Sequence, residues 1–141
     1  MTYPIGIQLN NPGNLEVGGP VFIGQVGTQG KWLKFIDPPH GLRAIIERLK
    51  AYQINDGCTT WNQMINRYAP PSDNNPTQAY AANVAKACGM DADTPVDFTN
   101  PTICADAMEA ITLQENGVQP YSPLTIQRAV SLVLAPPPTQ A

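Results

Sequence analysis

The segment "DPPHGLRAIIERLKAYQINDG", residues 37–57, decides the fold of this chain. Its apolar residues recur at helical spacing, whereas its charged residues fall mainly on other faces. The apolar positions are Leu42, Ile45, Ile46, Leu49 and Tyr52. Asp37 is a typical N-cap, Pro38 suits a first helical turn, and Gly57 marks the exit. We therefore predict a helix over residues 39–53 as the central buried element, with Ile45, Ile46 and Leu49 almost inaccessible.

Similar start and stop signals predict further helices along the chain. They run from Thr60 to Arg67, from Thr77 to Cys88, from Pro101 to Glu115 or Asn116, and onward from Ser122 and Pro123. "VFIGQVG" (21–27) and "KWLKFI" (31–36) flank a Gly-rich turn and predict a small β-hairpin. Residues 1–20, rich in proline and glycine, read as irregular. The expected fold class is mainly α with one hairpin, in a single domain over residues 1–135 with a Pro-rich tail over 136–141.

The composition excludes several classes of function. The 141 residues carry a formal net charge of −3 with only 8 Lys and Arg, and 13% of residues are charged. Such a chain is poorly suited to tracking nucleic-acid phosphates, and it has no segment that predicts membrane insertion. Its uncharged polar surface suits a neutral hydrogen-bonding ligand such as a glycan.

The cysteines and the single histidine favour no metal or cofactor. Cys58, Cys88 and Cys104 form no CxxC pair, and His40 has no partner histidine, so we expect free thiols and no zinc site. A Cys–His hydrolase remains a weak alternative. The N-terminal residues resemble no signal peptide, which predicts synthesis in a cytosol.

Glu115 is the most informative residue for chemistry. Ile111 lies four residues before it and Met108 seven, so Glu115 continues the apolar stripe of the 101–115 helix. Burial there would raise the pKa of its carboxyl, as a general acid requires near neutral pH. Alternatively, the helix ends before this residue and Glu115 points to water.

Two polar turns are candidate ligand contacts. "NNPGN" (10–14) is a strong turn signal in any protein, and its asparagines Asn10, Asn11 and Asn14 could also bind sugar hydroxyl and N-acetyl groups. In "YAPPSDNNPTQAY" (68–80) the two tyrosines should face the core. The exposed polar residues Asp73, Asn74, Asn75 and Thr77 could line a cleft.

Four segments in order resemble the landmarks of a family of phage-encoded lysozyme-like proteins. They are "LNNPGNL" (9–15), "GLRAIIERLKAYQ" (41–53), "NRYAPPSDNNPTQAY" (66–80) and "QENGVQPYS" (114–122). Where the family usually has Trp, Glu and His, this chain has Tyr68, Asp73 and Gln114. Gln114 removes an imidazole beside the acid but leaves Glu115 in place.

The resemblance implies a lysozyme-like α+β fold that cleaves the β-1,4 bond between N-acetylmuramic acid and N-acetylglucosamine, with Glu115 as its catalytic acid. In related chains the acid precedes the Asn-Pro-Gly segment, so this chain would be circularly permuted. The implied substrate-binding residues are Asn10, Asn11, Asn14, Tyr68, Asp73, Asn75, Thr77, Asn116 and Tyr121.

Two mechanisms and one non-enzymatic role stay open. A hydrolase needs a second carboxylate, for which Asp37, Asp73 and Glu16 are candidates without a convincing motif; a lytic transglycosylase needs none. The alternative is a virion structural protein that binds peptidoglycan or serves assembly. The expected partners are glycan strands and other virion proteins, and the expected location is the virion, acting in the host periplasm or cell wall.

Overall fold

The computed structural model describes residues 2–135, so the Pro-rich tail predicted for 136–141 lies outside the described residues. The chain is mainly helical with one antiparallel hairpin, as the sequence predicts. In order, the elements are α1 (Ile5–Gln8), β1 (Gln25–Gln29), β2 (Trp32–Phe35), α2 (Pro38–Asp56), α3 (Trp61–Tyr68), the 3-10 turn η1 (Pro71–Asp73), α4 (Thr77–Ala87), α5 (Pro101–Asn116) and α6 (Pro123–Leu134).

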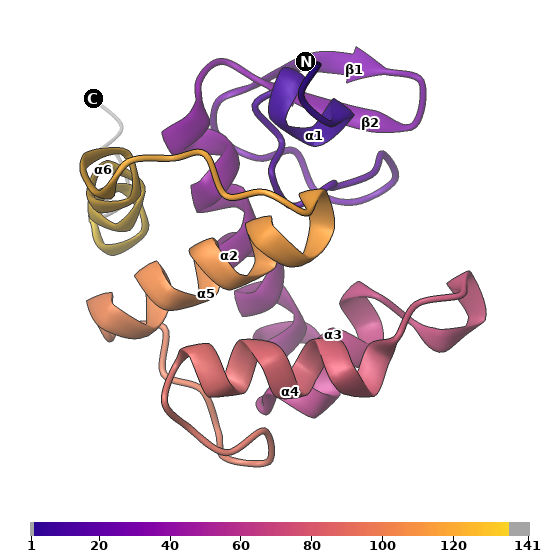
Figure 1. The fold of residues 1–141 in the computed structure, drawn as a ribbon, viewed down its shortest axis with the longest axis vertical. Helices are drawn as coiled ribbons and strands as arrows, with labels where there is room; N and C mark the ends of the chain where they lie inside the picture. The colour runs from indigo at the N-terminus through magenta and orange to yellow at the C-terminus, as the bar shows by residue number, and fades with distance from the viewer. Residues whose placement is uncertain (1, 136–141) are drawn as a thin grey trace.

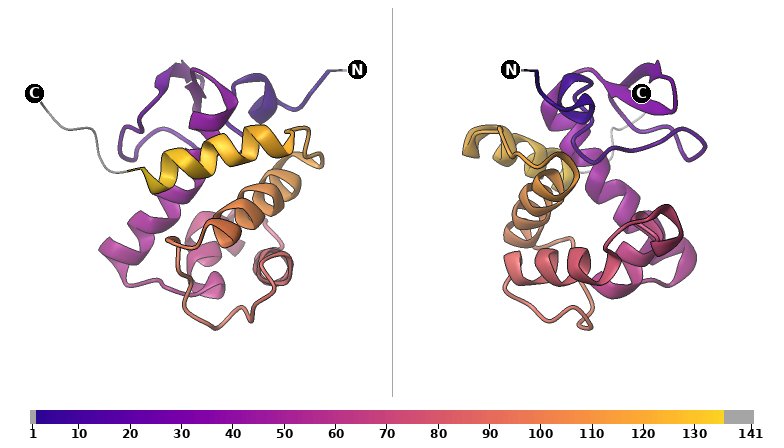
Figure 2. Two further views of the ribbon diagram at one scale, coloured as in Figure 1. Left: turned by 90° about the vertical axis from the view of Figure 1, so that its left-hand side faces the viewer. Right: turned by 45° about the vertical axis from the view of Figure 1, so that its right-hand side comes forward.

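Helix α2 runs through the centre of the molecule, with α5 crossing it and α6 packed alongside (Figure 1). The α3–α4 pair packs at one end of α2, and α1 with the hairpin lies at the other. Figure 2 shows the same division from two further sides. Ile45, Ile46 and Leu49 are each 0% exposed, which confirms the predicted buried face of α2.

Two hydrophobic clusters hold these parts together. The larger one joins α2 to all four helices that follow it, around residues such as Trp61, Tyr80 and Met108. The smaller one lies beneath the hairpin and consists of Leu15, Phe22, Leu33, Phe35 and Ala44. Ala44 belongs to α2, so this helix contributes to both clusters.

The predicted caps form the predicted hydrogen bonds. The side chain of Asp37 accepts from the backbone N–H of His40 at 2.9 Å, and Thr60 with Gln63 forms a capping box. Asn100 and Ser122 cap α5 and α6 in the same way. Gly117 ends α5 with a φ of 72°, a conformation that glycine adopts without strain.

Two local predictions were wrong. Residues 1–20 contain the one-turn helix α1, which the sequence analysis did not predict. The helix begins with backbone hydrogen bonds to the carbonyl of Pro4, and no side chain caps it. The first strand begins at Gln25 rather than Val21, and the expected turn residues Gly27, Thr28 and Gln29 pair within the ladder. Phe22 is instead buried in the smaller cluster, which fixes the chain ahead of the strand.

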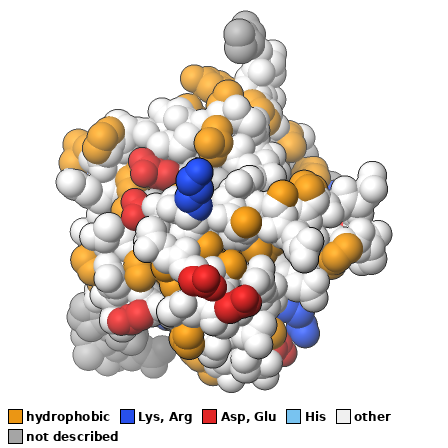
Figure 3. All heavy atoms as spheres, turned by 60° about the horizontal axis from the view of Figure 1, so that its bottom comes forward, with side chains coloured by type: hydrophobic (Ala, Val, Ile, Leu, Met, Phe, Trp, Pro, Cys, Tyr) orange, Lys and Arg blue, Asp and Glu red, His pale blue; other side chains and the backbone are white. Residues whose placement is uncertain are grey.

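The surface matches the low charge of the sequence. On the face of the molecule that includes α3 and α4, charged side chains are sparse among hydrophobic and uncharged atoms, and some of them lie next to one another (Figure 3). Within residues 2–135, no helix combines the length and the hydropathy needed to cross a bilayer.

A candidate active site at the end of helix α5

Glu115 lies in the last turn of α5, one residue before the helix ends. Its side chain is partly buried rather than pointing into bulk water. The side-chain amide of Asn14 donates to its Oε1 at 3.1 Å and to its backbone carbonyl at 3.2 Å. A residue near the start of the chain therefore fixes the carboxyl at the end of α5.

The turn that carries Asn14 is built on the buried side chain of Asn11. The Asn11 amide donates to the carbonyls of Leu15 at 2.9 Å and Leu33 at 3.0 Å, and its oxygen accepts from the N–H of Leu15 at 2.9 Å. Asn10 and Asn14 adopt positive φ values of 54° and 50°, which asparagine tolerates better than most residues. The Asn-Asn-Pro-Gly-Asn segment is thus a structural turn and also delivers Asn14 to Glu115.

Burial raises the pKa of the Glu115 carboxyl, since it disfavours the charged form. The side chains of Tyr80 and Asn14 act in the opposite direction, and the charge of Glu16 adds to the rise. The negative end of the α5 dipole also disfavours an anion at this position. The net effect is a carboxyl that keeps its proton to higher pH than an exposed glutamate.

Two tyrosines line the inner side of the carboxyl. Tyr80 is 2% exposed, and its hydroxyl lies beside Glu115 without a well-aligned hydrogen bond to any described residue. Tyr68 stacks edge-on to Tyr80 at 6.4 Å between ring centroids and donates to the carbonyl of Gly13 at 2.6 Å. Burial raises the pKa of both hydroxyls well above the ordinary tyrosine value, so both stay neutral donors.

Glu115 lines a polar pocket of about 460 Å³. Its lining comes from the 13–16 turn, the hairpin, the end of α3 and the loop that follows it. The residues are Gly13, Asn14, Glu16, Lys31, Trp32, Tyr68, Ala69, Asp73, Asn75 and Glu115. The structure therefore brings together Glu115, Asn14, Tyr68, Asp73 and Asn75 of the predicted site.

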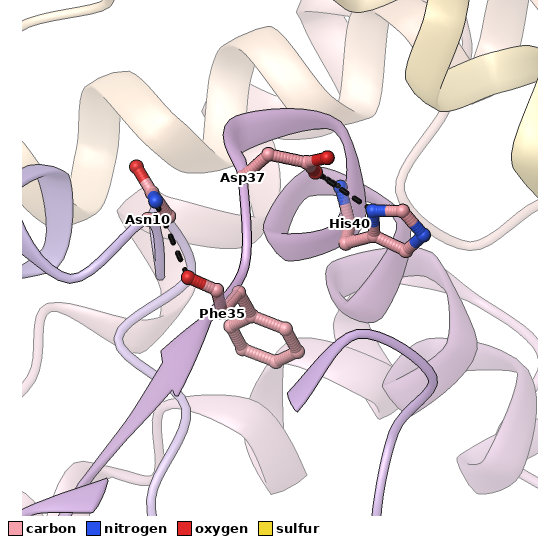
Figure 4. A network of polar contacts seen from close by, with 4 residues as sticks. All are labelled: Asn10, Phe35, Asp37 and His40. Carbon is pink, nitrogen blue, oxygen red and sulfur yellow. Dashed lines mark hydrogen bonds and ion pairs between the residues drawn. The ribbon is translucent and has the colours of Figure 1, made fainter. Parts of the chain in front are cut away.

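Asn10 and Asn11 of the predicted site do not line this pocket. The Asn10 amide donates to the carbonyl of Phe35 at 3.2 Å and ties the turn to the hairpin (Figure 4). Asn11 is 0% exposed and its amide is fully used by the backbone. Asn11 therefore holds the turn and leaves no side-chain group free for a ligand, whereas Asn10 ties the turn to the hairpin through its amide nitrogen alone.

Thr77, Asn116 and Tyr121 also lie outside it. The Thr77 hydroxyl donates to the carbonyl of Ala69 at 2.6 Å and secures the start of α4. The Asn116 amide donates to the carbonyls of Pro12 at 2.8 Å and Thr112 at 3.0 Å. Tyr121 is half-buried against the larger cluster, and burial raises its pKa to about 12. Their side chains therefore hold the scaffold around the pocket.

The sequence reading missed Lys31 and Trp32 as pocket residues. Lys31 lies over the Trp32 ring, 4.6 Å from its centroid, and pairs with Glu16 at 2.9 Å. Trp32 is partly exposed at the start of β2. A tryptophan next to a Gly-rich turn was the signal that the sequence offered, but only the fold shows which pocket it borders.

Asp37, a candidate second carboxylate, is engaged elsewhere. Its Oδ1 accepts from the backbone N–H of His40 at 2.9 Å and lies 2.7 Å from the His40 ring Nδ1 (Figure 4). Burial by itself would raise its pKa, but the contacts with His40 prevail and lower it. Glu16 and Asp73 are the candidates that line the pocket with Glu115.

The geometry gives no support to a Cys–His pair or a metal centre. His40 lies at the start of α2, whereas Cys58 follows the far end of that helix. Burial raises the pKa of Cys88 to about 12 and of Cys104 to about 11, which makes both poor nucleophiles at neutral pH. Residues 2–135 contain no group of three His, Cys, Asp or Glu side chains placed to hold a metal ion.

The fold and site together define a small helical protein with a partly buried carboxyl in a polar surface pocket. The chain is similar to Protein P5 of Pseudoalteromonas phage PM2, with 29% identity over 123 residues. The matched region covers 83% of this chain and 74% of the phage protein. No family model matches the sequence. The protein is thus similar to a bacteriophage protein.

Proposed function

We propose that this protein cleaves the glycan strands of peptidoglycan, with Glu115 as the general acid. The observation that carries the proposal is the environment of the Glu115 carboxyl. It has a raised pKa, and it faces a pocket formed by segments that lie far apart in the sequence. Desolvation beside neutral donors is the environment that prepares a glutamate for proton donation near neutral pH.

In this mechanism Glu115 protonates the oxygen of the β-1,4 bond between N-acetylmuramic acid and N-acetylglucosamine. Positive charge develops at the sugar carbon as that bond breaks. The Asn14 amide, 3.1 Å from Oε1, orients the carboxyl and stabilises the carboxylate left after proton transfer. The neutral Tyr80 hydroxyl is placed to do the same from the buried side.

Besides the charged residues Glu16, Lys31 and Asp73, the pocket offers groups that suit a sugar. Trp32 offers an apolar ring face of the kind on which a sugar ring stacks. The amide of Asn75 and backbone groups of the 13–16 turn offer donors and acceptors beside it. This combination of an aromatic face and neutral polar groups is the basis for a glycan substrate.

The fate of the intermediate depends on Glu16 and Asp73. If either activates water or attacks the sugar, the product has a reducing end; without such a partner the substrate's own N-acetylmuramic acid hydroxyl closes an anhydro ring. Mass spectrometry of digested cell wall separates these products. Loss of cleavage in Glu16→Gln or Asp73→Asn would identify the second carboxylate of a hydrolase.

The similarity to a bacteriophage protein supports the setting that we propose. A virion-associated enzyme would be made in the host cytoplasm and would act on the cell wall during infection. The same similarity also supports a second candidate, a non-enzymatic virion protein that uses the pocket to bind peptidoglycan or to assemble.

Zymography on purified cell wall tests the proposal. Wild type should clear the wall, whereas Glu115→Gln should lose about a hundredfold or more of the activity, because the amide keeps the size of the side chain but donates no acidic proton. Glu109→Gln is the matched control, since Glu109 lies on the same helix, outside the pocket, and contacts Gln119 at 3.3 Å. Equal clearing by wild type and Glu115→Gln would remove Glu115 from the mechanism, and no clearing by either would favour the binding protein.

A further inference from the structure

A second pocket shares part of its lining with the first. It encloses about 290 Å³. Gly13, Asn14, Glu16, Tyr68 and Asp73 line both pockets, so a ligand can extend from one into the other. The second pocket differs in being bordered by two arginines, Arg48 and Arg67.

Arg48 has hydrogen-bonding capacity that the described protein does not use. Its guanidinium lies against Gly19 and over the Phe22 ring, 5.4 Å from the ring centroid. Within residues 2–135 it forms no hydrogen bond, and no carboxylate lies within 4 Å of it, although the side chain is half-buried. By contrast, Arg43 on the same helix bonds the carbonyl of Leu132 at 3.4 Å and pairs with Glu47 at 3.8 Å.

The ion pairs around this pocket favour an anionic occupant. Arg67 pairs with Asp56 at 3.3 Å, which holds a second guanidinium at the rim. Of the carboxylates that line the pocket, Glu16 is offset by Lys31 at 2.9 Å, and Asp73 is exposed to solvent. The half-buried and unpaired charge in the pocket is therefore the positive charge of Arg48.

We propose that this arginine pocket, lined by Arg48 and Arg67, binds a carboxylate carried by the glycan substrate. A guanidinium presents parallel N–H groups that match the two oxygens of a carboxylate, and desolvation by the pocket strengthens that bond. The inference rests on the proposed function, because it places an acidic substituent beside the bond that Glu115 would cleave. Peptidoglycan carries such carboxylates on its stem peptide and, once the peptide is removed, on the lactyl group of the sugar.

Equilibrium binding in the Glu115→Gln background tests the inference without turnover. The probes are a neutral chitooligosaccharide, a muropeptide of equal glycan length, and that muropeptide after amidase treatment. The muropeptide should bind about tenfold or more tightly than the neutral probe, and adding Arg48→Gln should abolish the difference while leaving the neutral probe unchanged. Higher salt should shrink the difference in the parent protein alone.

Two further variants keep the test decisive. Lys34→Gln removes the same charge from an exposed strand residue outside both pockets and should preserve the discrimination. Arg67→Gln, a change at an exposed rim position, should weaken the discrimination even if Arg48→Gln folds poorly. Sensitivity to the arginines that survives amidase treatment assigns the lactyl carboxylate, and sensitivity that is lost assigns the peptide carboxylate.

The inference and the proposed function fail in different ways. If both arginine variants bind the acidic probes as tightly as the parent, or if the parent binds none of the probes, the arginine pocket is not a carboxylate site. That result leaves cleavage by wild type as a separate measurement. If instead the arginines control binding while Glu115→Gln still clears the wall, the pocket holds and the role of Glu115 does not.

Discussion

The Glu115 carboxyl occupies a position that disfavours its charged form. Asn14 holds it by a hydrogen bond, yet burial and the nearby charge of Glu16 raise its pKa. A group in this situation costs the protein stability at neutral pH, which is common where an ionisable residue serves chemistry rather than folding.

Glu115→Gln should therefore stabilise the protein at neutral pH. The folded-state pKa is raised above the unfolded value, so the favourable contribution of the protonated carboxyl is complete below the unfolded value and is lost as pH rises through the folded pKa. Glutamine does not ionise and keeps the contact with Asn14. Urea unfolding across acidic to neutral pH should show the variant more stable at the neutral end and equal to wild type below a pH of about 4. Parallel curves for the two proteins would contradict the raised pKa.

Activity should depend on the protonation of the same carboxyl. In the proposed mechanism the protonated form is the proton donor, so cleavage should decline as pH rises through the folded pKa of Glu115. Tyr80→Phe removes a side chain that lowers this pKa, so the decline should move to higher pH. The pH dependence of kcat/KM for both proteins measures the change, and superimposable profiles would exclude a role for the Tyr80 hydroxyl.

The sequence could predict some of these residues and not others. Helical periodicity places Glu115 on the face of Met108 and Ile111, and α5 continues far enough for that pattern to hold. No such pattern distinguishes Asn11 from Asn14. The two asparagines differ in the partner of the side-chain amide, which is the carbonyl of Leu33 for Asn11 and the carboxyl of Glu115 for Asn14. Those partners come from other parts of the chain, so the motif identified the turn but not the side chain that reaches the site.

At the scale of elements, α2 links the core to the site. Its buried face carries Ile46, and its first turns contact the Asn10–Pro12 turn at Gly41. A side chain at Gly41 would overlap the carbonyl of Asn10, so the glycine allows the turn to approach the helix. The position of Asn14 thus depends on how closely α2 and the turn pack.

Ile46→Ala should lower the free energy of unfolding by about 2–5 kcal/mol, because a cavity would form where the side chain is now 0% exposed. Chemical denaturation measures the change. Ile54→Ala is the matched control on the same helix, where the side chain is 78% exposed, and it should change the value by less than about 0.5 kcal/mol. Similar losses at both positions would mean that α2 does not present the face described.

Gly41→Ala should also destabilise the protein, by about 1–3 kcal/mol, because the added methyl group forces α2 and the turn apart. The sign is informative, since glycine to alanine within a helix otherwise stabilises by up to about 1 kcal/mol. The melting temperature of the variant, compared with that of wild type, measures the sign of this change. A rise in melting temperature would show that the turn does not pack closely on Gly41.

Elements defined by short-range signals were the best predicted. The caps at Asp37, Thr60, Asn100 and Ser122 depend on residues within one turn, and all of them form. The start of the first strand was predicted too early, because the burial of Phe22 beneath the hairpin depends on residues that are distant in the sequence. Likewise, the short helix α1 packs against α5, and the sequence of its four residues does not predict this interaction.

At the scale of the molecule, the site joins the turn near the start of the chain to the end of α5. Asn14 and Glu115 are 101 residues apart, and a second bond links Asn116 to Pro12 at 2.8 Å. Contacts at this separation leave no periodic signal, so only the resemblance to lysozyme-like proteins led to the expectation that these segments meet.

The three cysteines allow the stability of the fold to be measured, since two of them are partly exposed and one is buried. Cys58 is half-exposed after α2, Cys88 is partly buried at the end of α4, and Cys104 is 0% exposed within α5, where its Sγ contacts the carbonyl of Phe98 at 3.2 Å. All three are free thiols, and burial raises the pKa of Cys104 to about 11.

Under native conditions a thiol reagent should therefore modify Cys58 first. Cys104 should react at least about a thousandfold more slowly than in the unfolded chain, because its labelling requires global opening. Mass spectrometry resolves the order of modification, and labelling in denaturant without reductant should count three thiols. A count of one would reveal a disulfide, and rapid native labelling of Cys104 would mean that α5, the helix that carries Glu115, separates from the core without unfolding of the whole.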